Sequence, residues 1–340
     1  MKKLKYFLFL LLIAIIGTSI YIAVQPNDYE FSRSRTIQAP ASLLFNKVND
    51  FKNWLQFSPW LEQEPNANLT YGETTSGKGA SYSWEGAILG EGSMETLATE
   101  GNTFISQRIY FIKPFSSESD IYWNFEPSEN GTKVIWGMEG EQDFMTKMYT
   151  AFAGSIEKNT APDFERGLFK LDSVAKADMQ KYSITVNGVT QHGGGYYLYN
   201  TASCKLDDVE SKIQEMLPKV TDFATANNIT MAGAPFVNYI KWDEANNAAI
   251  ISCCIPTTEK VITTDSGILT GQLLPFKAVK TTLKGNYTNL DEAWDTARNY
   301  IPQNGLEFAE NGPVLEVYPT DPKNYPNPAD WVTEIYIAVN

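Results

Sequence analysis

The sequence predicts an α+β protein with an N-terminal transmembrane helix followed by two globular domains. Three observations lead to this prediction: residues 6–24 form an uncharged apolar run, residues 66–140 break into short alternating segments, and residues 182–340 contain an internal repeat. The 340 residues exceed one typical domain of about 150 residues, leaving room for two domains and an additional segment. We therefore divide the chain into a membrane anchor or signal segment at 1–25, a first domain at 31–181 and a second at 182–340.

The composition of the chain argues against several classes of function. Asp and Glu number 40 against 27 Lys and Arg, and a net charge of −13 would be repelled by a phosphate backbone, so we expect no nucleic-acid partner. Hydrophobic residues make up 43% of the chain, which is enough to fill folded cores. The only histidine is His192, so a zinc site with several imidazole ligands cannot form. We expect neither a metal nor a cofactor.

The apolar run at residues 6–24 reads YFLFLLLIAIIGTSIYIAV. At about 1.5 Å per helical residue it nearly crosses a hydrocarbon core of about 30 Å. Three lysines precede the run, and the first positive charge after it is Arg33, so the positive-inside rule places the N-terminus in the cytoplasm and the globular part outside it. Alternatively, Gly17 and Ser19 belong to the cleavage site of a signal peptide, and the mature protein is secreted.

The first domain reads as a strand, short helices, a meander and a long helix. A strand at 31–40 ends at Pro40, which can occupy the first turn of a helix. Residues 51–57 predict a second short helix, and the alternating segments of 66–140 predict an antiparallel meander. Apolar residues recur at i, i+4, i+7 and i+11 within 161–181, which indicates an amphipathic helix packed on the sheet.

This order, with the segments APASLLFNKVNDFKNWLQFSPW, GKGASYSWEG, GEGSMET and FERGLFKL, resembles the SRPBCC superfamily of START-like and polyketide cyclase-like domains. The resemblance covers about residues 32–180. It implies a helix-grip fold, in which a curved sheet wraps around the C-terminal helix and leaves an apolar cavity. Most members bind lipids or other hydrophobic molecules, and a minority are enzymes.

Aromatic residues of the first domain are the candidates for lining such a cavity, although each of them could equally belong to an ordinary core. We select Trp60 and Trp84 as ligand-binding candidates from a set that also contains Trp54, Tyr82, Trp136 and Phe164. No pair of carboxylates or histidines at a fixed spacing marks a reaction, so we predict no catalytic residue here.

The second domain contains two copies of one pattern, each predicted as a strand, a helix and a hairpin. The first copy has LDDVESKIQEMLPKVTDFATANN, AGAPFVNYIKWD and AAIISCCIPT, and the second has LDEAWDTARNYIPQNG, ENGPVLEVYPTDP and WVTEIYIAV. Two such copies can join their sheets about a pseudo-twofold axis and leave a groove where they meet. The alignment places Pro235 with Pro313, Asn238 with Glu316, and Ile255 with Ile337.

The segments GPVLEVYPTDP and WVTEIYIAV resemble the GyrI-like effector-binding domain, which also forms the drug-sensing part of some AraC-type and MerR-type regulators. One difference from the family pattern is Ala338, which replaces the usual proline. The resemblance implies a small-molecule pocket with aromatic walls around one acidic residue, often receiving cationic amphiphiles. By the motif, the acidic residue is Glu316.

Strand alternation independently places Glu316 on the same face as Tyr318, so a carboxylate stands beside an aromatic ring. Such a pair can receive an organic cation, with a cation–π contribution of about 0.5–2 kcal/mol. The alternative is a glutamate that faces solvent. Further ligand-binding candidates are Tyr239, Tyr287 and Trp294, for which the alternative is core packing.

Taken together, the sequence favours a membrane-anchored, exported and non-enzymatic binding protein for hydrophobic or cationic small molecules. Two alternatives stay open. One is a small-molecule hydrolase that uses Glu316 as a general acid or base, since some proteins of the GyrI-like family hydrolyse reactive compounds. The other is a structural envelope protein without a ligand. We interpret the glycine run after His192 as a loop or bulge, because a strand-like segment follows it.

Overall fold

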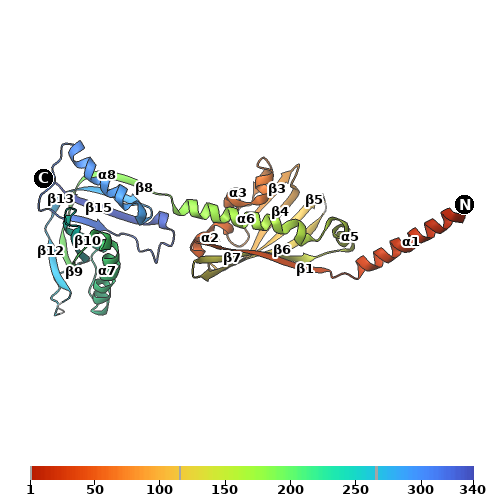
Figure 1. Cartoon of the computed structure of the whole chain (residues 1–340), viewed down its shortest axis with the longest axis horizontal. Coiled ribbons are helices and arrows are strands. Elements are labelled where there is room, and N and C mark those ends of the chain that lie inside the picture. The colour runs from red at the N-terminus through yellow and green to blue at the C-terminus, as the bar shows by residue number, and fades with distance from the viewer. Residues whose placement is uncertain (1, 115, 265–266) are drawn as a thin grey trace. The chain divides into compact units, whose positions relative to one another are not determined.

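The computed structural model describes residues 2–114, 116–264 and 267–340 (Figure 1). The chain separates into two compact units, Met1–Ala177 and Asp178–Asn340. Each unit contains one antiparallel sheet with helices packed on it, so the prediction of an α+β protein is confirmed.

The N-terminal helix α1 runs from Lys2 to Ala23. Within the described residues it is the one helix that is long and apolar enough to cross a membrane. Nearly all of its side chains are exposed; the exceptions, Ser19 and Ile22, lie near its C-terminal end. Length, composition and exposure all agree with a candidate membrane span or signal sequence.

The sheet of the first unit has seven strands in the order β1-β7-β6-β5-β4-β3-β2, and every neighbouring pair is antiparallel. The predicted strand and meander are therefore correct. The strands are β1 (Asp28–Ile37), β2 (Asn68–Tyr71), β3 (Ser81–Gly86), β4 (Gly90–Glu100), β5 (Phe104–Lys113), β6 (Ser117–Ser128) and β7 (Gly131–Glu141).

The helices of the first unit are more numerous than the sequence pattern indicates. They are α2 (Ala41–Asn49), α3 (Trp54–Phe57), α4 (Pro59–Gln63), α5 (Phe144–Ala153) and α6 (Ile156–Met179). The predicted second short helix ends at Phe57 with Ser58 as its C-cap, and Ser58 also caps the following helix α4, since its hydroxyl accepts a hydrogen bond from the Leu61 N–H at 3.4 Å. The long helix begins earlier than residue 161 because Ser155 caps its first turn.

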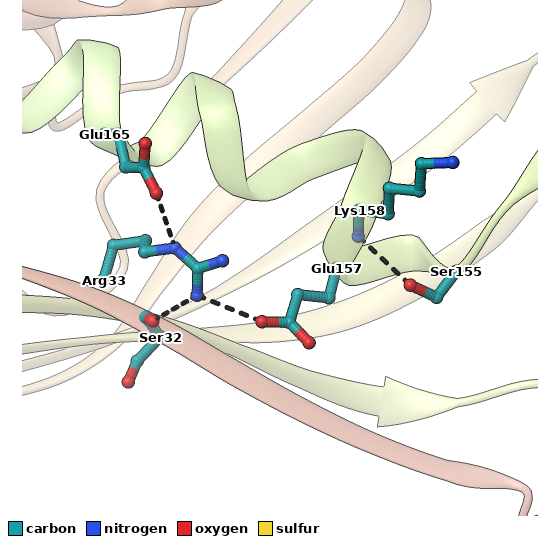
Figure 2. A network of polar contacts seen from close by, with 6 residues as sticks. All are labelled: Ser32, Arg33, Ser155, Glu157, Lys158 and Glu165. Carbon is teal, nitrogen blue, oxygen red and sulfur yellow. Dashed lines mark hydrogen bonds and ion pairs between the residues drawn. The ribbon is translucent and has the colours of Figure 1, made fainter.

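Helix α6 is fixed to the sheet by a buried apolar stripe and by ion pairs at its edge. Phe164, Leu168 and Leu171 are fully buried, and the Phe164 ring stacks on Trp136 with 4.1 Å between the ring centroids. Figure 2 shows Arg33 of β1 donating to Glu165 at 2.8 Å and to Glu157 at 3.1 Å. Because these ion pairs are solvent-exposed, each stabilises by at most about 1 kcal/mol, and the apolar burial dominates.

The second unit contains eight strands in the order β12-β9-β11-β10-β14-β15-β13-β8. Two helices, α7 (Val209–Ala226) and α8 (Leu290–Gln303), pack on it. The strands are β8 (Ser183–His192), β9 (Gly195–Cys204), β10 (Phe236–Asp243), β11 (Ala248–Thr257), β12 (Leu269–Leu273), β13 (Phe276–Lys284), β14 (Val314–Val317) and β15 (Val332–Ala338).

This strand order is symmetric about the β10–β14 pair, as the internal repeat predicts. Val237 pairs with Glu316 and Asn238 pairs with Leu315, which agrees with the alignment of Asn238 with Glu316. The alignment of Ile255 with Ile337 is wrong by one residue: Val314 pairs with Ile337, and its counterpart Phe236 pairs with Cys254. The connection between β14 and β15 is much longer than that between β10 and β11, so sequence spacing does not fix this register.

The glycine run after His192 forms a short connection between β8 and β9, two strands that do not pair with each other, since β8 pairs with β13 and β9 pairs with β11 and β12. His192 is the last residue of β8, and β9 begins at Gly195. Gly194 has φ of 69°, and a side chain there would collide with the carbonyl oxygen of Leu273. The loop that we expected is therefore confined to Gly193 and Gly194.

The stacked core around α6 gives a stability prediction. Phe164→Ala should lower the free energy of unfolding of the first unit by about 3–5 kcal/mol, because it leaves a cavity beside Trp136. Phe169→Ala, on the exposed side of the same helix, should cost less than about 1 kcal/mol. Urea unfolding of the full chain in detergent, followed by tryptophan fluorescence, measures both. Equal losses would contradict the packing described.

Candidate functional site

Glu316 lies on β14, next to the symmetry axis of the second sheet, and only 3% of its surface is exposed. Its carboxylate accepts hydrogen bonds from three neutral side chains. Trp294 Nε1 and Tyr239 Oη donate to Oε2 at 2.8 and 3.2 Å, and Tyr318 Oη donates to Oε1 at 2.6 Å. Three aromatic residues predicted from the sequence therefore meet at the carboxylate of a fourth predicted residue, Glu316.

Both copies of the repeat contribute to this cluster. Tyr239 comes from β10 of the first copy, where the pairing with β11 shifts by one residue between Tyr239 and Lys241. Trp294 projects from α8 of the second copy and packs at the margin of the apolar cluster that holds this helix on the sheet. The β10–β14 pairing brings Val237 opposite Glu316, and therefore Tyr239 onto the same face.

A second layer of aromatic rings surrounds the first. Tyr287, also predicted, lies edge-on to Tyr318 at 5.9 Å and packs against Trp331 at 4.7 Å. Trp242 lies 5.9 Å from Tyr239 on the other side. Trp331 is not among the residues predicted from the sequence. It lies in an irregular segment just before β15, where strand alternation does not define which side a residue faces. Its place in the WVTEIYIAV segment was the available signal.

The electrostatics of the cluster are dominated by burial. Loss of water raises the pKa of Glu316 above its usual range, and the three hydrogen bonds only partly offset this effect. Burial also raises the pKa of Tyr239 and Tyr318 well above 10, and that of Tyr287 to about 12, so all three hydroxyl groups stay protonated. In the described part of the chain, no Lys, Arg or His lies within ion-pair distance of Glu316.

Glu334 on the neighbouring strand β15 shows the opposite arrangement. Its carboxylate binds the Lys280 ammonium at 2.8 Å and accepts a hydrogen bond from Tyr336 at 2.8 Å. Glu334 is therefore neutralised within the chain, whereas Glu316 is not. The Arg298 guanidinium lies over the ring of Trp294 at 5.4 Å instead of pairing with the acid.

The first unit contains a separate apolar cavity of about 200 Å³. Trp60 and Trp84, both predicted, belong to its walls. Trp60 Nε1 donates to Asp163 Oδ2 at 3.0 Å, which fixes the orientation of the ring. The lining is completed by Leu61, Tyr82, Ile88, Leu89, Ile109 and Phe111.

Of the other aromatic candidates of the first unit, Tyr82 belongs to the cavity lining and three do not. Trp54, Trp136 and Phe164 are completely buried in a stacked core, with Trp123 4.3 Å from Trp136. On the sheet, Trp136 and Trp123 lie on the same inner face as the cavity residue Ile109, so strand alternation cannot distinguish a core position from a cavity position. A wider depression of about 600 Å³ at residues 38–41 and 127–132 has no aromatic or charged side chain in its lining.

Glu64 fixes the tip of the β3–β4 hairpin, which belongs to the wall of the apolar cavity lined by Trp60 and Trp84. Its Oε1 accepts from the Ala87 N–H at 2.7 Å, and its Oε2 accepts from the Ile88 and Leu89 N–H groups, each at 2.9 Å. These backbone hydrogen bonds lower the pKa of Glu64. The β3–β4 tip is therefore held by one ionised side chain. Among the described residues, no group of three or more His, Cys, Asp or Glu side chains is arranged to hold a metal.

Comparison with protein-family models gives each unit a separate match. Residues 37–169 match the family described as polyketide cyclase / dehydrase and lipid transport. Residues 197–340 match the GyrI-like small molecule binding domain. Both resemblances are confirmed. The cavity lies within the polyketide cyclase-like domain, and the Glu316 cluster lies within the GyrI-like domain, so both candidate sites fall in families of small-molecule-binding domains.

Comparisons with whole proteins are weaker. None of the curated proteins matches the chain. The C-terminal domain of EcmrR is 18% identical over 47% of this chain and 98% of its own, with a TM-score of 0.41. A protein from Mesorhizobium loti is 17% identical over 44% and 98%, with a TM-score of 0.33, and a protein of unknown function from Staphylococcus aureus is 9% identical over 45% and 99%, with a TM-score of 0.35. The domain assignment rests on the family models alone.

The raised pKa of Glu316 predicts a pH-dependent stability of the GyrI-like domain. Its protonated form stabilises the fold fully below the ordinary pKa of 4.5, and this contribution is lost as pH rises through the higher folded value. Glu316→Gln should therefore reduce the loss of stability over the pH range above 4.5 in which the folded-state carboxyl group gives up its proton. Urea midpoints across this range test it, with Glu334→Gln as the control. Parallel pH profiles for Glu316→Gln and the unmodified chain would refute the effect.

The Glu64 contacts predict a second pH effect, with the opposite sign. Because the pKa of Glu64 is lowered, its contacts are complete above the ordinary value of 4.5 and are lost as pH falls through the lowered one. Glu64→Gln should loosen the β3–β4 tip at neutral pH, so the amides of Ala87, Ile88 and Leu89 exchange faster with deuterium. Glu100→Gln, an exposed residue at the far end of β4, should leave these amides unchanged. Unchanged exchange in both variants would exclude a role for Glu64.

Proposed function

We propose that this chain is a membrane-anchored binding protein whose GyrI-like domain takes organic cations with aromatic or apolar groups at Glu316. Its polyketide cyclase-like domain takes a small hydrophobic molecule in the apolar cavity. The observation that carries the proposal is the Glu316 carboxylate, which is buried among aromatic rings and has three neutral donors but, within the part of the chain that the structure describes, no basic partner.

A buried carboxylate without a counter-charge is costly in its ionised form, and protonation is one way to avoid the cost. A bound cation is another, since its positive charge compensates the carboxylate and allows the proton to leave. The faces of Tyr239, Trp294 and Tyr318 can then contact the cation and its apolar groups. We therefore expect cation binding to be coupled to release of a proton from Glu316.

Access to the acid requires a rearrangement of side chains. Both carboxylate oxygens are occupied by donors from Tyr239, Trp294 and Tyr318. These three residues are half-buried and reach the surface, while Glu316 lies behind them. Rotation of one ring is enough to exchange a hydrogen bond for a contact with the ligand. The half-buried outer rings Tyr287 and Trp331 remain available to enclose its apolar part.

The cavity in the polyketide cyclase-like domain suits an uncharged ligand. Its volume of about 200 Å³ is below that of typical drug-sized pockets, which range over about 300–1,000 Å³. The walls are aromatic and aliphatic. We therefore propose a compact hydrophobic molecule, or one acyl segment of a larger lipid, as its occupant.

The N-terminal helix supports a membrane location. Its 22 residues correspond to about 33 Å of helix, which matches the hydrocarbon core of a bilayer. The lysines at its N-terminal end and the absence of basic residues between Lys5 and Arg33 support a cytoplasmic N-terminus with exported domains. Secretion after signal cleavage is the alternative that leaves the binding function unchanged.

Hydrolysis is less well supported than binding. The thiol that lies closest in the strand register is Cys253, which pairs with Val237, the partner of Glu316. Burial raises the pKa of Cys253 to about 12, so it remains a protonated core residue and not a nucleophile. Glu316 itself can exchange a proton, but that property serves cation binding equally well.

Calorimetric titration with tetraphenylphosphonium tests the proposed cation site. Glu316→Gln should weaken binding by tenfold or more, because a charge-assisted contact of about 2 kcal/mol is lost. In the unmodified chain, binding should weaken as pH falls through the raised pKa of Glu316, since the site then holds a proton. The neutral compound triphenylphosphine oxide should show neither effect.

Glu334→Gln serves as the matched control for this titration. It removes a carboxylate that already has Lys280 as its partner. Both variants and the unmodified chain are titrated in the same detergent. Equal affinity of tetraphenylphosphonium for the unmodified chain and for Glu316→Gln would refute the cation site.

A further inference from the structure

Helix α5 exposes its apolar face and buries its polar one. Met145, Tyr149 and Phe152 lie on one side of the helix, and Met145 and Phe152 are 62% and 80% exposed. On the other side, Lys147 is only 7% exposed. A helix on the surface of a water-soluble domain has the reverse arrangement, with apolar residues facing the core. The exposed face of α5 therefore needs an apolar partner.

The buried side of α5 is attached directly to the end of the candidate membrane span. The Lys147 ammonium donates to the Gln25 carbonyl oxygen and to Asn27 Oδ1, two residues that follow α1. The Gln142 N–H donates to the Asn27 carbonyl oxygen at 2.7 Å. Figure 1 shows α5 at the end of the first sheet from which α1 extends. If α1 spans a bilayer, α5 is held at its surface.

The register of the first sheet places further apolar groups at the same end. Asp28 at the start of β1 pairs with Glu141, the residue just before the segment that leads into α5. Following the antiparallel pairs across the sheet, the β5–β6 connection and the β3–β4 tip also lie at this end. Ile88 at that tip is 69% exposed, and Ile112 near the end of β5 is half-exposed.

We propose that this end of the polyketide cyclase-like domain lies in the interface of the membrane that α1 spans, with α5 and Ile88 inserted among the lipids. This inference rests on the membrane anchor of the proposed function. Ile88, Leu89 and Phe111 belong both to this end of the sheet and to the lining of the cavity. The hairpin tip held by Glu64 is thereby the part of the cavity wall nearest the bilayer, and the ligand enters from the lipid side.

The charges at this end specify the kind of lipid surface. Glu141 and Asp143 flank the start of α5 and are exposed. An acidic rim is repelled by anionic headgroups, so apolar insertion and not charge attraction drives the contact. The surface that fits is therefore a zwitterionic one. A bilayer of phosphatidylcholine should support docking better than one rich in phosphatidylglycerol.

Site-specific fluorescence quenching in proteoliposomes tests the docking with the full chain. Cysteine probes replace Ile13 in α1, Phe152 in α5 and Asn130 at the opposite end of the sheet, each in a Cys204→Ser background. Cys253 and Cys254 are fully buried and need no replacement. The vesicles contain phosphatidylcholine with a nitroxide-labelled lipid, and iodide in the buffer serves as the aqueous quencher.

Docking predicts that the probe at Phe152 is quenched by the nitroxide lipid and shielded from iodide, whereas the probe at Asn130 shows the reverse. Quenching at Ile13 by the lipid reports the anchor separately. If Ile13 is quenched by lipid while Phe152 is as accessible to iodide as Asn130, the docking is refuted and the anchor stands. If both Ile13 and Phe152 are accessible to iodide, both are refuted. Protection of Phe152 from both quenchers would show that a second copy covers α5, which also overturns the proposal.

Discussion

A carboxylate without a counter-charge at the centre of the second sheet constrains the domain around it. Removing an ionised carboxylate from water costs several kcal/mol unless hydrogen bonds or an opposite charge compensate it. The GyrI-like domain supplies the hydrogen bonds from three different elements: Tyr239 on β10, Trp294 on α8 and Tyr318 just after β14. The pairing of β10 with β14 and the packing of α8 must therefore both be correct for Glu316 to be tolerated.

Duplication explains how the cluster is built, and divergence between the copies explains why it holds one charge. The counterpart of Glu316 in the first copy is Asn238, which is neutral. Tyr239 has Val317 as its counterpart, so the aromatic donor on β10 is not repeated on β14. The two copies of the repeat thus place different side chains next to the symmetry axis. The consequence is one buried carboxylate beside the symmetry axis instead of two equivalent ones.

Local patterns in the sequence predicted the elements, but contacts between distant elements required the structure. Alternation placed Glu316 and Tyr318 on one face, and the repeat predicted the symmetric sheet. The convergence of Tyr239 and Trp294 on the same carboxylate depends on the β10–β14 register and on the bulge in β10, neither of which follows from spacing. In the first domain, cavity and core aromatics share one face, so Trp84 and Trp136 could not be separated. Helix α5 went unpredicted because its exposed face is apolar.

Burial alone does not distinguish Glu316 from other acids of the chain. Asp172 on α6 is 5% exposed, close to the value for Glu316, but Arg35 and Lys176 bind its carboxylate at 2.8 and 3.0 Å. Glu334 likewise has Lys280. Both acids have a basic side chain of the protein as their partner. A ligand cation would have to compete with that side chain for the carboxylate. Among the residues that the structure describes, Glu316 has only neutral donors as partners, so an incoming cation would meet no competing Lys or Arg side chain. The missing counter-charge, and not the depth of burial, is therefore the property on which the proposed cation site at Glu316 rests.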